Sequence, residues 1–266
     1  MEDQTMVRSG PAPTVAPPSV EELAIRRDLA AAYRLAALFK WDDGIGTHFT
    51  ARLPSREGEP EAFLINPFGL LFEEVTASNL VKVDVDGNIL SDNGYPVNRA
   101  GFVVHSAVHL ARADAGCILH LHTHDGCAVA ALEEGILPIG QLATTMWKKI
   151  AIHEYEGPAV RPEERERMAR ALGTRDLMIL RNHGTMAIGA TVAEAFHRMF
   201  LLETACSVQV RALSMGRPLH LPDQAVLDHV DANYGVRNEH SAHFARNLLW
   251  PAWLRKLDRL CPEYKD

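Results

Sequence analysis

The chain has 266 residues, of which 47% are hydrophobic and 23% are charged, and its formal net charge is -7 at pH 7. This composition is typical of a globular protein of enzyme size, and the acidic balance argues against nucleic acid or an anionic membrane as a partner. No apolar run approaches the roughly 18 residues of a membrane span, and the N-terminus lacks the pattern of a signal peptide. We therefore expect a cytoplasmic protein with a small-molecule substrate.

The sequence divides into a short tail and one larger unit. Residues 1–18 are rich in proline and poor in large apolar side chains, so we predict a disordered tail that cannot offset its own ordering entropy. Residues 19–266 show no internal repeat, linker or break in composition, which favours a single domain with a helical extension at its C-terminal end. The four cysteines lack CxxC spacing and are predicted to be reduced, packed thiols.

The first predicted element is a helix from Ser19 to about Phe39, in which Ser19 is the N-cap and Glu22 completes a capping box. Three strand-like segments follow within residues 41–90, and the Asp-Gly pair at 86 and 87 predicts a hairpin turn after the third. We expect these strands to form an antiparallel meander.

Helices and buried strands alternate after this meander. A helix capped by Asn98 precedes the strand GCILHLHT, and Asp125 is predicted to cap the next helix, which Gly135 ends. A helix from Pro162 to Leu172, stopped by Gly173, leads into the strands DLMIL and TMAIG.

Two further helices are predicted after these strands. Thr191 and Glu194 form a second capping box at the start of a long helix that ends at about Leu213. The last 20 residues are aromatic and amphipathic, which predicts a helix that docks on the domain or on a neighbouring subunit. Together these elements indicate one α/β domain with a mixed or mainly antiparallel sheet.

A candidate metal site lies in the histidine-rich segment HLHTH. His120 and His122 are two residues apart on a predicted strand, so their side chains share one face and can bind one divalent ion. His183, in the polar turn of ILRNHGTMAIG, is the predicted third ligand, and Gly184 is expected to let the backbone bend there. Three neutral imidazoles leave an open position, as in catalytic metal sites.

Other histidines lie nearby. His124 continues the same alternation beyond the strand and can cap the next helix or line a cleft. His105 and His109 are four residues apart on a predicted helix; we interpret His105 as a contact to ligand or substrate and His109 as structural. Cys117 and Cys127 flank the histidine segment and are weaker ligand candidates. The chain has no P-loop, dinucleotide-binding glycine motif or serine elbow, so the metal is the main indication of function.

Five motifs in order resemble the class II aldolase/adducin family, with the first and last closest to its adducin-head branch. The resemblance covers about residues 20–215, and the motifs read LINPFGLLFEEVTASNLVKVDVDGNIL, AGFVVHSAVHLAR, ILHLHTH, ILRNHGTMAIG and TVAEAFHRMFLLETACSVQVRAL. The resemblance implies a three-layer α/β/α fold around a mainly antiparallel sheet, and a homotetramer whose active sites lie between subunits. It also implies a Zn²⁺ ion held by His120, His122 and His183.

The sequence departs from the family pattern at two places. The family's acid/base glutamate aligns with Gly101, which has no side chain and cannot transfer a proton. The phosphate-binding positions of the aldolases fall on His48, Phe68, Arg99 and Ala100, which makes a phosphorylated sugar a poor substrate. Phe68, with Met146 and Trp147, would suit an apolar or aromatic body, and Arg99 could pair with a carboxylate.

These features favour a metal-dependent lyase, aldolase-like or decarboxylating, that acts on a non-phosphorylated oxo- or hydroxy-acid. The candidate proton-transfer groups are a metal-bound water and four side chains, namely His48, His105, His124 and Tyr155. Decarboxylation needs no base at the bond-breaking step and so tolerates Gly101 best.

Two alternatives remain open at this point. Three histidines on Fe²⁺ leave room for a bidentate substrate and O2, so a non-haem iron oxygenase that cleaves an oxo-acid side chain is the first. A non-catalytic, adducin-like oligomerisation module is the second.

Overall fold

The computed structural model describes residues 17–90, 93–157 and 162–266, so most of the predicted N-terminal tail lies outside the described residues. Within the described residues, seven strands form one sheet in the order β3-β2-β1-β4-β7-β6-β5. The strands are β1 (His48–Arg52), β2 (Ala62–Ile65), β3 (Val81–Asp84), β4 (Cys117–Leu121), β5 (Ile150–His153), β6 (Leu177–Leu180) and β7 (Gly184–Gly189). Neighbouring strands are antiparallel except β5 and β6, which are parallel.

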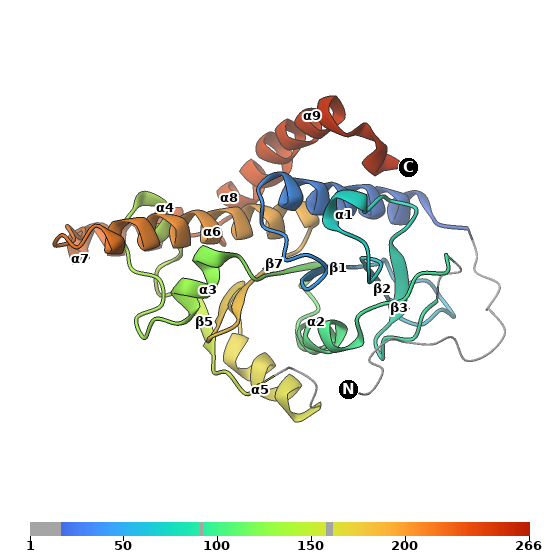
Figure 1. Ribbon diagram of the computed structural model, residues 1–266, viewed down its shortest axis with the longest axis horizontal. Helices are drawn as coiled ribbons and strands as arrows, with labels where there is room; N and C mark the ends of the chain where they lie inside the picture. Colours follow the sequence, from blue (N-terminus) through green and yellow to red (C-terminus); the bar gives the residue numbers. More distant parts are fainter. Residues whose placement is uncertain (1–16, 91–92, 158–161) are drawn as a thin grey trace.

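Helices cover both faces of this sheet (Figure 1). The α-helices are α1 (Val20–Leu38), α2 (Arg99–Ala111), α3 (His124–Ala130), α4 (Gln141–Met146), α5 (Pro162–Leu172), α6 (Val192–Ser214), α7 (Gln224–Tyr234), α8 (Glu239–Phe244) and α9 (Trp250–Leu260). Short 3-10 turns are η1 (Phe72–Glu74) and η3 (Pro262–Lys265), and a π-helical turn, η2 (Ala245–Leu249), joins α8 to α9. Helices α1 and α6 lie on one face and α2 and α5 on the other, which confirms the predicted three-layer α/β/α fold.

The two cores show how the strands divide their side chains between the layers. In β4, Cys117, Leu119 and Leu121 belong to the core beneath α1 and α6, whereas Ile118 packs with Val104 and Val108 of α2. This alternation is the two-residue repeat of a strand covered on both faces. It places the side chains of even-numbered β4 residues, including His120, toward α2.

Local signals set most helix starts. The side chains of Ser19, Asn98 and Thr191 accept hydrogen bonds from the backbone N–H three residues later, as predicted. The Glu22 carboxylate, however, pairs with Arg26 and Lys82. Because Lys82 lies on β3, the ion pair between Glu22 and Lys82 links α1 to the sheet.

Two predictions about α3 were wrong. Thr123, not Asp125, is its N-cap and accepts a hydrogen bond from the Gly126 N–H, while Asp125 lies in the first turn. The helix ends at Ala130, five residues before Gly135. The threonine hydroxyl takes the cap because β4 ends at Leu121, which leaves Thr123 in the extended conformation that an N-cap requires.

The predicted C-terminal helix docks on its own chain. Helix α9 lies outside α1 (Figure 1), and Leu257 is fully buried in the core that α1 shares. Around it, six aromatic rings pack together: Phe39, Trp41, Phe196, Phe200, Trp250 and Trp253. This aromatic cluster fixes the segment that leaves α1 and enters β1. No described helix combines the length and apolar character that crossing a membrane would demand.

Candidate metal centre

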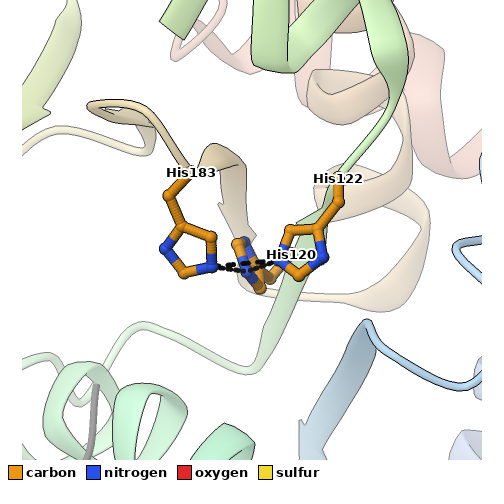
Figure 2. Close-up of side chains that lie close together, drawn as sticks. All are labelled: His120, His122 and His183. Carbon is orange, nitrogen blue, oxygen red and sulfur yellow. Dashed lines mark hydrogen bonds between the residues drawn. The ribbon is translucent and has the colours of Figure 1, made fainter. Parts of the chain in front are cut away.

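Three histidines converge at the C-terminal end of β4. His120 lies on β4, His122 follows the strand directly, and His183 lies in the turn between β6 and β7. Figure 2 shows the three imidazoles pointing toward one another. Their Nε2 atoms are 2.8 Å apart for His120 and His122, 3.0 Å for His122 and His183, and 3.2 Å for His120 and His183. We call this group the histidine triad.

The pairing of β4 with β7 brings His183 to the strand that carries the other two. Leu121 pairs with Thr185, so the residue before β7 returns to the end of β4. The backbone bend is made by Asn182, at φ 51°, and not by Gly184 as predicted. Gly184 is needed for close packing instead, because a Cβ there would lie 2.2 Å from the Leu121 carbonyl oxygen.

Hydrogen bonds at the opposite ring nitrogens orient two members of the triad. The Nδ1–H of His120 donates to the Thr185 carbonyl at 2.9 Å, and that of His122 donates to the Asp43 carboxylate at 3.0 Å. With Nδ1 protonated, each neutral ring presents a lone pair at Nε2. Two lone pairs 2.8 Å apart repel unless a cation lies between them. The arrangement therefore fits a divalent ion, since three nitrogens at ~2.0–2.1 Å from tetrahedral Zn²⁺ are roughly 3.3 Å apart.

Burial holds two members of the triad in the neutral form. Burial, followed by the neighbouring imidazoles, lowers the pKa of His120 well below its usual value. Burial also lowers the pKa of His183 to about 4, with His122 adding to the shift. Neutral imidazole is the form that binds metal, so these two ligands need no deprotonation at neutral pH.

A buried carboxylate braces the two strands that carry the triad. Glu203 of α6 is 3% exposed, and it accepts hydrogen bonds from Thr123 Oγ1 and Thr185 Oγ1, both at 2.5 Å. Burial raises the pKa of Glu203, although both hydroxyls oppose the shift. Thr123 follows His122 and Thr185 supplies the carbonyl that orients His120, so Glu203 fixes the backbone on both sides of the triad.

A second group of histidines lies behind the triad, between β1 and α2. We call His48, His105 and His109 the buried histidine group; all three are at most 5% exposed. The His48 ring is 4.3 Å from the His105 ring and 5.6 Å from the His120 ring, measured between centroids. Burial, with His122 adding, lowers the pKa of His48 to about 3.

The His48 imidazole fills the space that a side chain at residue 101 would use. A Cβ built on Gly101 would lie 2.7 Å from His48 Cε1 and 2.8 Å from Nδ1, closer than real Cβ atoms approach. Gly101 and His48 are therefore a matched pair, because the missing side chain at residue 101 leaves the room that the imidazole occupies.

Hydrogen bonds fix the direction of His105. His109 Nδ1 donates to the Ala115 carbonyl at 2.9 Å, so its Nε2 must accept from the Thr50 hydroxyl at 2.8 Å. The Thr50 oxygen then accepts from His105 Nδ1, also at 2.8 Å. His105 Nε2 is left as a lone pair with no hydrogen-bond partner among the described residues. His105 thus lies behind His48 and His109 is structural.

The remaining predicted catalytic residues lie at the surface. His124 is exposed at the start of α3, two residues after His122. The Tyr155 side chain is 55% exposed and lines, with His183, a small depression beside the triad. His124 is close to the triad along the chain, and Tyr155 is close to it across this depression. Neither side chain is buried as His48 is.

The predicted substrate-binding residues are scattered. Phe68 is half-buried in the loop after β2, and Arg99 is exposed at the first residue of α2. Met146 is fully buried in the main core, so it is a packing residue within this chain and the predicted pocket role is not supported. The Trp147 ring is half-buried under the Lys148 ammonium, and α4 itself borders a separate cavity of about 470 Å³.

Sequence reasoning missed three polar groups of the site: Asp43, Thr50 and Glu203. Asp43 follows Asp42 in a glycine-containing turn, a composition that signals only a loop. Thr50 and Glu203 occur within a largely buried strand and a largely buried helix, and a buried polar residue there does indicate a specific partner.

Comparison with known proteins agrees with this geometry. The family model described as "Class II Aldolase and Adducin N-terminal domain" matches residues 27–210. A solved aldolase II superfamily protein from Pseudomonas syringae is 46% identical, with a TM-score of 0.85 over 93% of this chain and 97% of its own. L-fuculose 1-phosphate aldolase from Glaciozyma antarctica is 27% identical, with a TM-score of 0.80 over 96% of each chain. Alpha-adducin from Rattus norvegicus is 47% identical over 204 residues, which are 75% of this chain and 27% of alpha-adducin.

Proposed function

The chain belongs to the class II aldolase and adducin family, and on this premise we propose that it is a metal-dependent lyase. Its substrate is a non-phosphorylated oxo- or hydroxy-acid in which a carbon–carbon bond is cleaved, by retro-aldol reaction or by decarboxylation. The observation that carries this proposal is the convergence of three Nε2 atoms within 3.2 Å, with Nδ1 of two of them tied to acceptors.

His120, His122 and His183 would hold the metal, Zn²⁺ or Fe²⁺. When bound, the ion acts as a Lewis acid that polarises substrate oxygens and stabilises the carbanion left by bond cleavage. The three ligands are neutral, so the negative charge that balances a divalent cation comes largely from the substrate. A carboxylate next to a carbonyl or hydroxyl oxygen supplies that charge in a bidentate group, which supports an acid as the substrate.

His48 is the protein group best placed to exchange a proton with the substrate. Its ring lies beside His120 and occupies the side-chain space of Gly101. Both ring nitrogens are buried without a hydrogen bond of normal geometry to the described residues, so either is available to a substrate hydroxyl. His105 packs against the other side of the ring and limits its rotation. Burial keeps His48 neutral, so in a retro-aldol reaction it would accept the proton of the substrate hydroxyl, whereas a decarboxylation needs no base for bond cleavage.

We further propose a homotetramer with active sites between subunits. A neighbouring chain would bring the exposed Tyr155 or the half-buried Trp147 to the depression beside His183. This arrangement would bring together substrate-binding residues that are scattered within one chain.

The experiment that tests the lyase combines metal analysis with turnover. Protein purified without added metal should contain a divalent ion and should consume 2-oxo or 2-hydroxy acids without oxygen uptake. Oxygen consumed in proportion to product would replace the lyase by a non-haem iron oxygenase. Faster turnover of a sugar phosphate than of any acid would overturn the proposed substrate class.

The similarity to alpha-adducin supports a second candidate, a non-catalytic oligomerisation module. The convergence of the triad's Nε2 lone pairs argues against this candidate, because an oligomerisation module does not need a metal-binding site. A chain that binds no Zn²⁺ or Fe²⁺, and whose assembly is unchanged in His120→Ala, would favour this candidate over the enzyme.

A further inference from the structure

We propose that Asp43 is a positioning residue of the metal centre, which holds His122 with its Nε2 directed at the ion. The proposal rests on the proposed metal site. Asp43 Oδ2 lies 3.0 Å from His122 Nδ1 and accepts its proton. His122 lies just beyond the strand, since β4 ends at Leu121. Its ring therefore depends on a side-chain contact for its orientation.

The chain around Asp43 is built to present this carboxylate. The Gly46 N–H donates to the Asp43 carbonyl at 2.8 Å, and Gly44, at φ 52°, lets the chain reverse between them. A Cβ on Gly46 would lie 2.9 Å from Asp43 Oδ2, so only glycine leaves the carboxylate where it is. The turn and the carboxylate position are therefore coupled.

Both ends of this segment are anchored. On one side, the Trp41 ring packs on Phe39 at 5.0 Å and on Phe196 at 5.8 Å within the aromatic cluster. On the other side, the Thr47 hydroxyl donates to the backbone carbonyl of His120, which is itself a proposed metal ligand. Asp43 thus lies in the middle of a short segment held at the aromatic cluster and at the metal centre itself.

The contact matters for orientation and not for the stability of the fold. The Asp43 side chain is 56% exposed, and exposed ion pairs contribute little to folding. A carboxylate that accepts from a ligand imidazole has a different effect, because it selects the tautomer with a bare Nε2 and makes that nitrogen a better donor to the metal. Loss of such a partner typically weakens metal binding roughly 10- to 100-fold.

The test measures Zn²⁺ dissociation constants by chelator competition for four variants of the full chain. Asp43→Ala should weaken binding roughly 10- to 100-fold, and Asp43→Asn less, because the amide oxygen still accepts from Nδ1. Gly46→Ala should show a smaller loss with Asp43 still present. The matched control is Asp42→Asn, which removes the same charge from the adjacent exposed position and should bind Zn²⁺ as the native chain does.

A second measurement separates orientation from folding and from metal binding. Nitrogen NMR of the metal-free protein should find His122 as the Nδ1–H tautomer in the native chain and a mixture in Asp43→Ala, at unchanged melting temperature. Equal Zn²⁺ affinity in Asp43→Ala and Asp42→Asn, or an unchanged tautomer, would overturn the positioning role. A native chain that does not bind Zn²⁺ would instead contradict the proposed metal centre. The NMR measurement of the His122 tautomer would still decide whether Asp43 orients His122.

Discussion

The histidine triad and the buried histidine group are built from the same residue in the same number, yet their hydrogen bonds lead to opposite properties. In the triad, the Nδ1–H groups of His120 and His122 donate to acceptors outside the group. The Nε2 atom of each ring therefore points toward the centre of the triad. In the buried group, His105 and His109 share one hydroxyl, that of Thr50. The first group brings its lone pairs together at one point, whereas the second pairs one nitrogen of His105 and one of His109 with a shared hydroxyl.

This contrast shows that histidine spacing alone does not identify a metal site. His105 and His109 have the i, i+4 spacing of a helical chelate, but the hydroxyl of Thr50 on the facing strand binds one nitrogen of each ring. The triad combines two residues near one strand with a third from a different turn. What distinguishes a ligand is the partner of its other nitrogen.

The largest effect should follow from removing a triad member. In His183→Ala, one of three ligands is lost, so Zn²⁺ affinity should fall by more than the roughly 10- to 100-fold typical of losing a ligand's hydrogen-bond partner. Metal content after dialysis and lyase turnover check this. His220→Ala, at an exposed histidine beyond α6, is the control for stray surface binding. Full metal content in His183→Ala would remove His183 from the site.

Thr50→Val should affect folding and spare the metal. The substitution keeps the shape but leaves a buried donor on His105 and a buried acceptor on His109 unpaired, at a cost of about 2–4 kcal/mol in the free energy of unfolding. Urea unfolding of the metal-free protein measures it, with Thr50→Ser as the matched variant that retains the hydroxyl. A loss of Zn²⁺ affinity without a loss of stability would show that the buried histidine group supports the metal site, which contradicts the separate roles of the two histidine groups.

Gly101→Ala tests the pairing of His48 with Gly101. The new Cβ would overlap the imidazole, and displacing a packed ring should cost about 1–3 kcal/mol. In a His48→Ala background the same change should cost almost nothing, because the space is then free. Additive effects in this double-mutant cycle would contradict the steric pairing.

Measured per pH unit, the smallest predicted effect is on the pH dependence of stability. Burial lowers the pKa of His109 to about 3, below the 6.5 of an unperturbed histidine, so the unfolded chain binds the extra proton first as pH falls. The stabilisation is thus complete above pH 6.5 and is lost progressively toward pH 3. In the metal-free protein, His109→Gln should flatten the slope near pH 5 by about 1.4 kcal/mol per pH unit. Urea unfolding across this range decides it, and an equal slope in His109→Gln would contradict the assignment.

Sequence signals that act within a few residues predicted the structure well. The caps at Ser19, Asn98 and Thr191 depend on a side chain and a backbone N–H three residues apart, and all three starts are correct. The cap of α3 was misassigned because Thr123 and Asp125 are both good N-caps, and only the end of β4 decides between them. Elements with weak local patterns, such as the edge strand β5 and the short α4, were not predicted.

The sequence by itself determined the family, the order of the main elements and the parity that places His120 and His122 on one side of a strand. Tertiary structure decided the rest of the site, because its hydrogen bonds join residues distant in the chain. Asp43 reaches His122 across 79 positions, and Thr50 reaches His105 across 55. No local pattern records that His48 would fill the space above Gly101, since β1 and α2 meet only when the sheet is assembled.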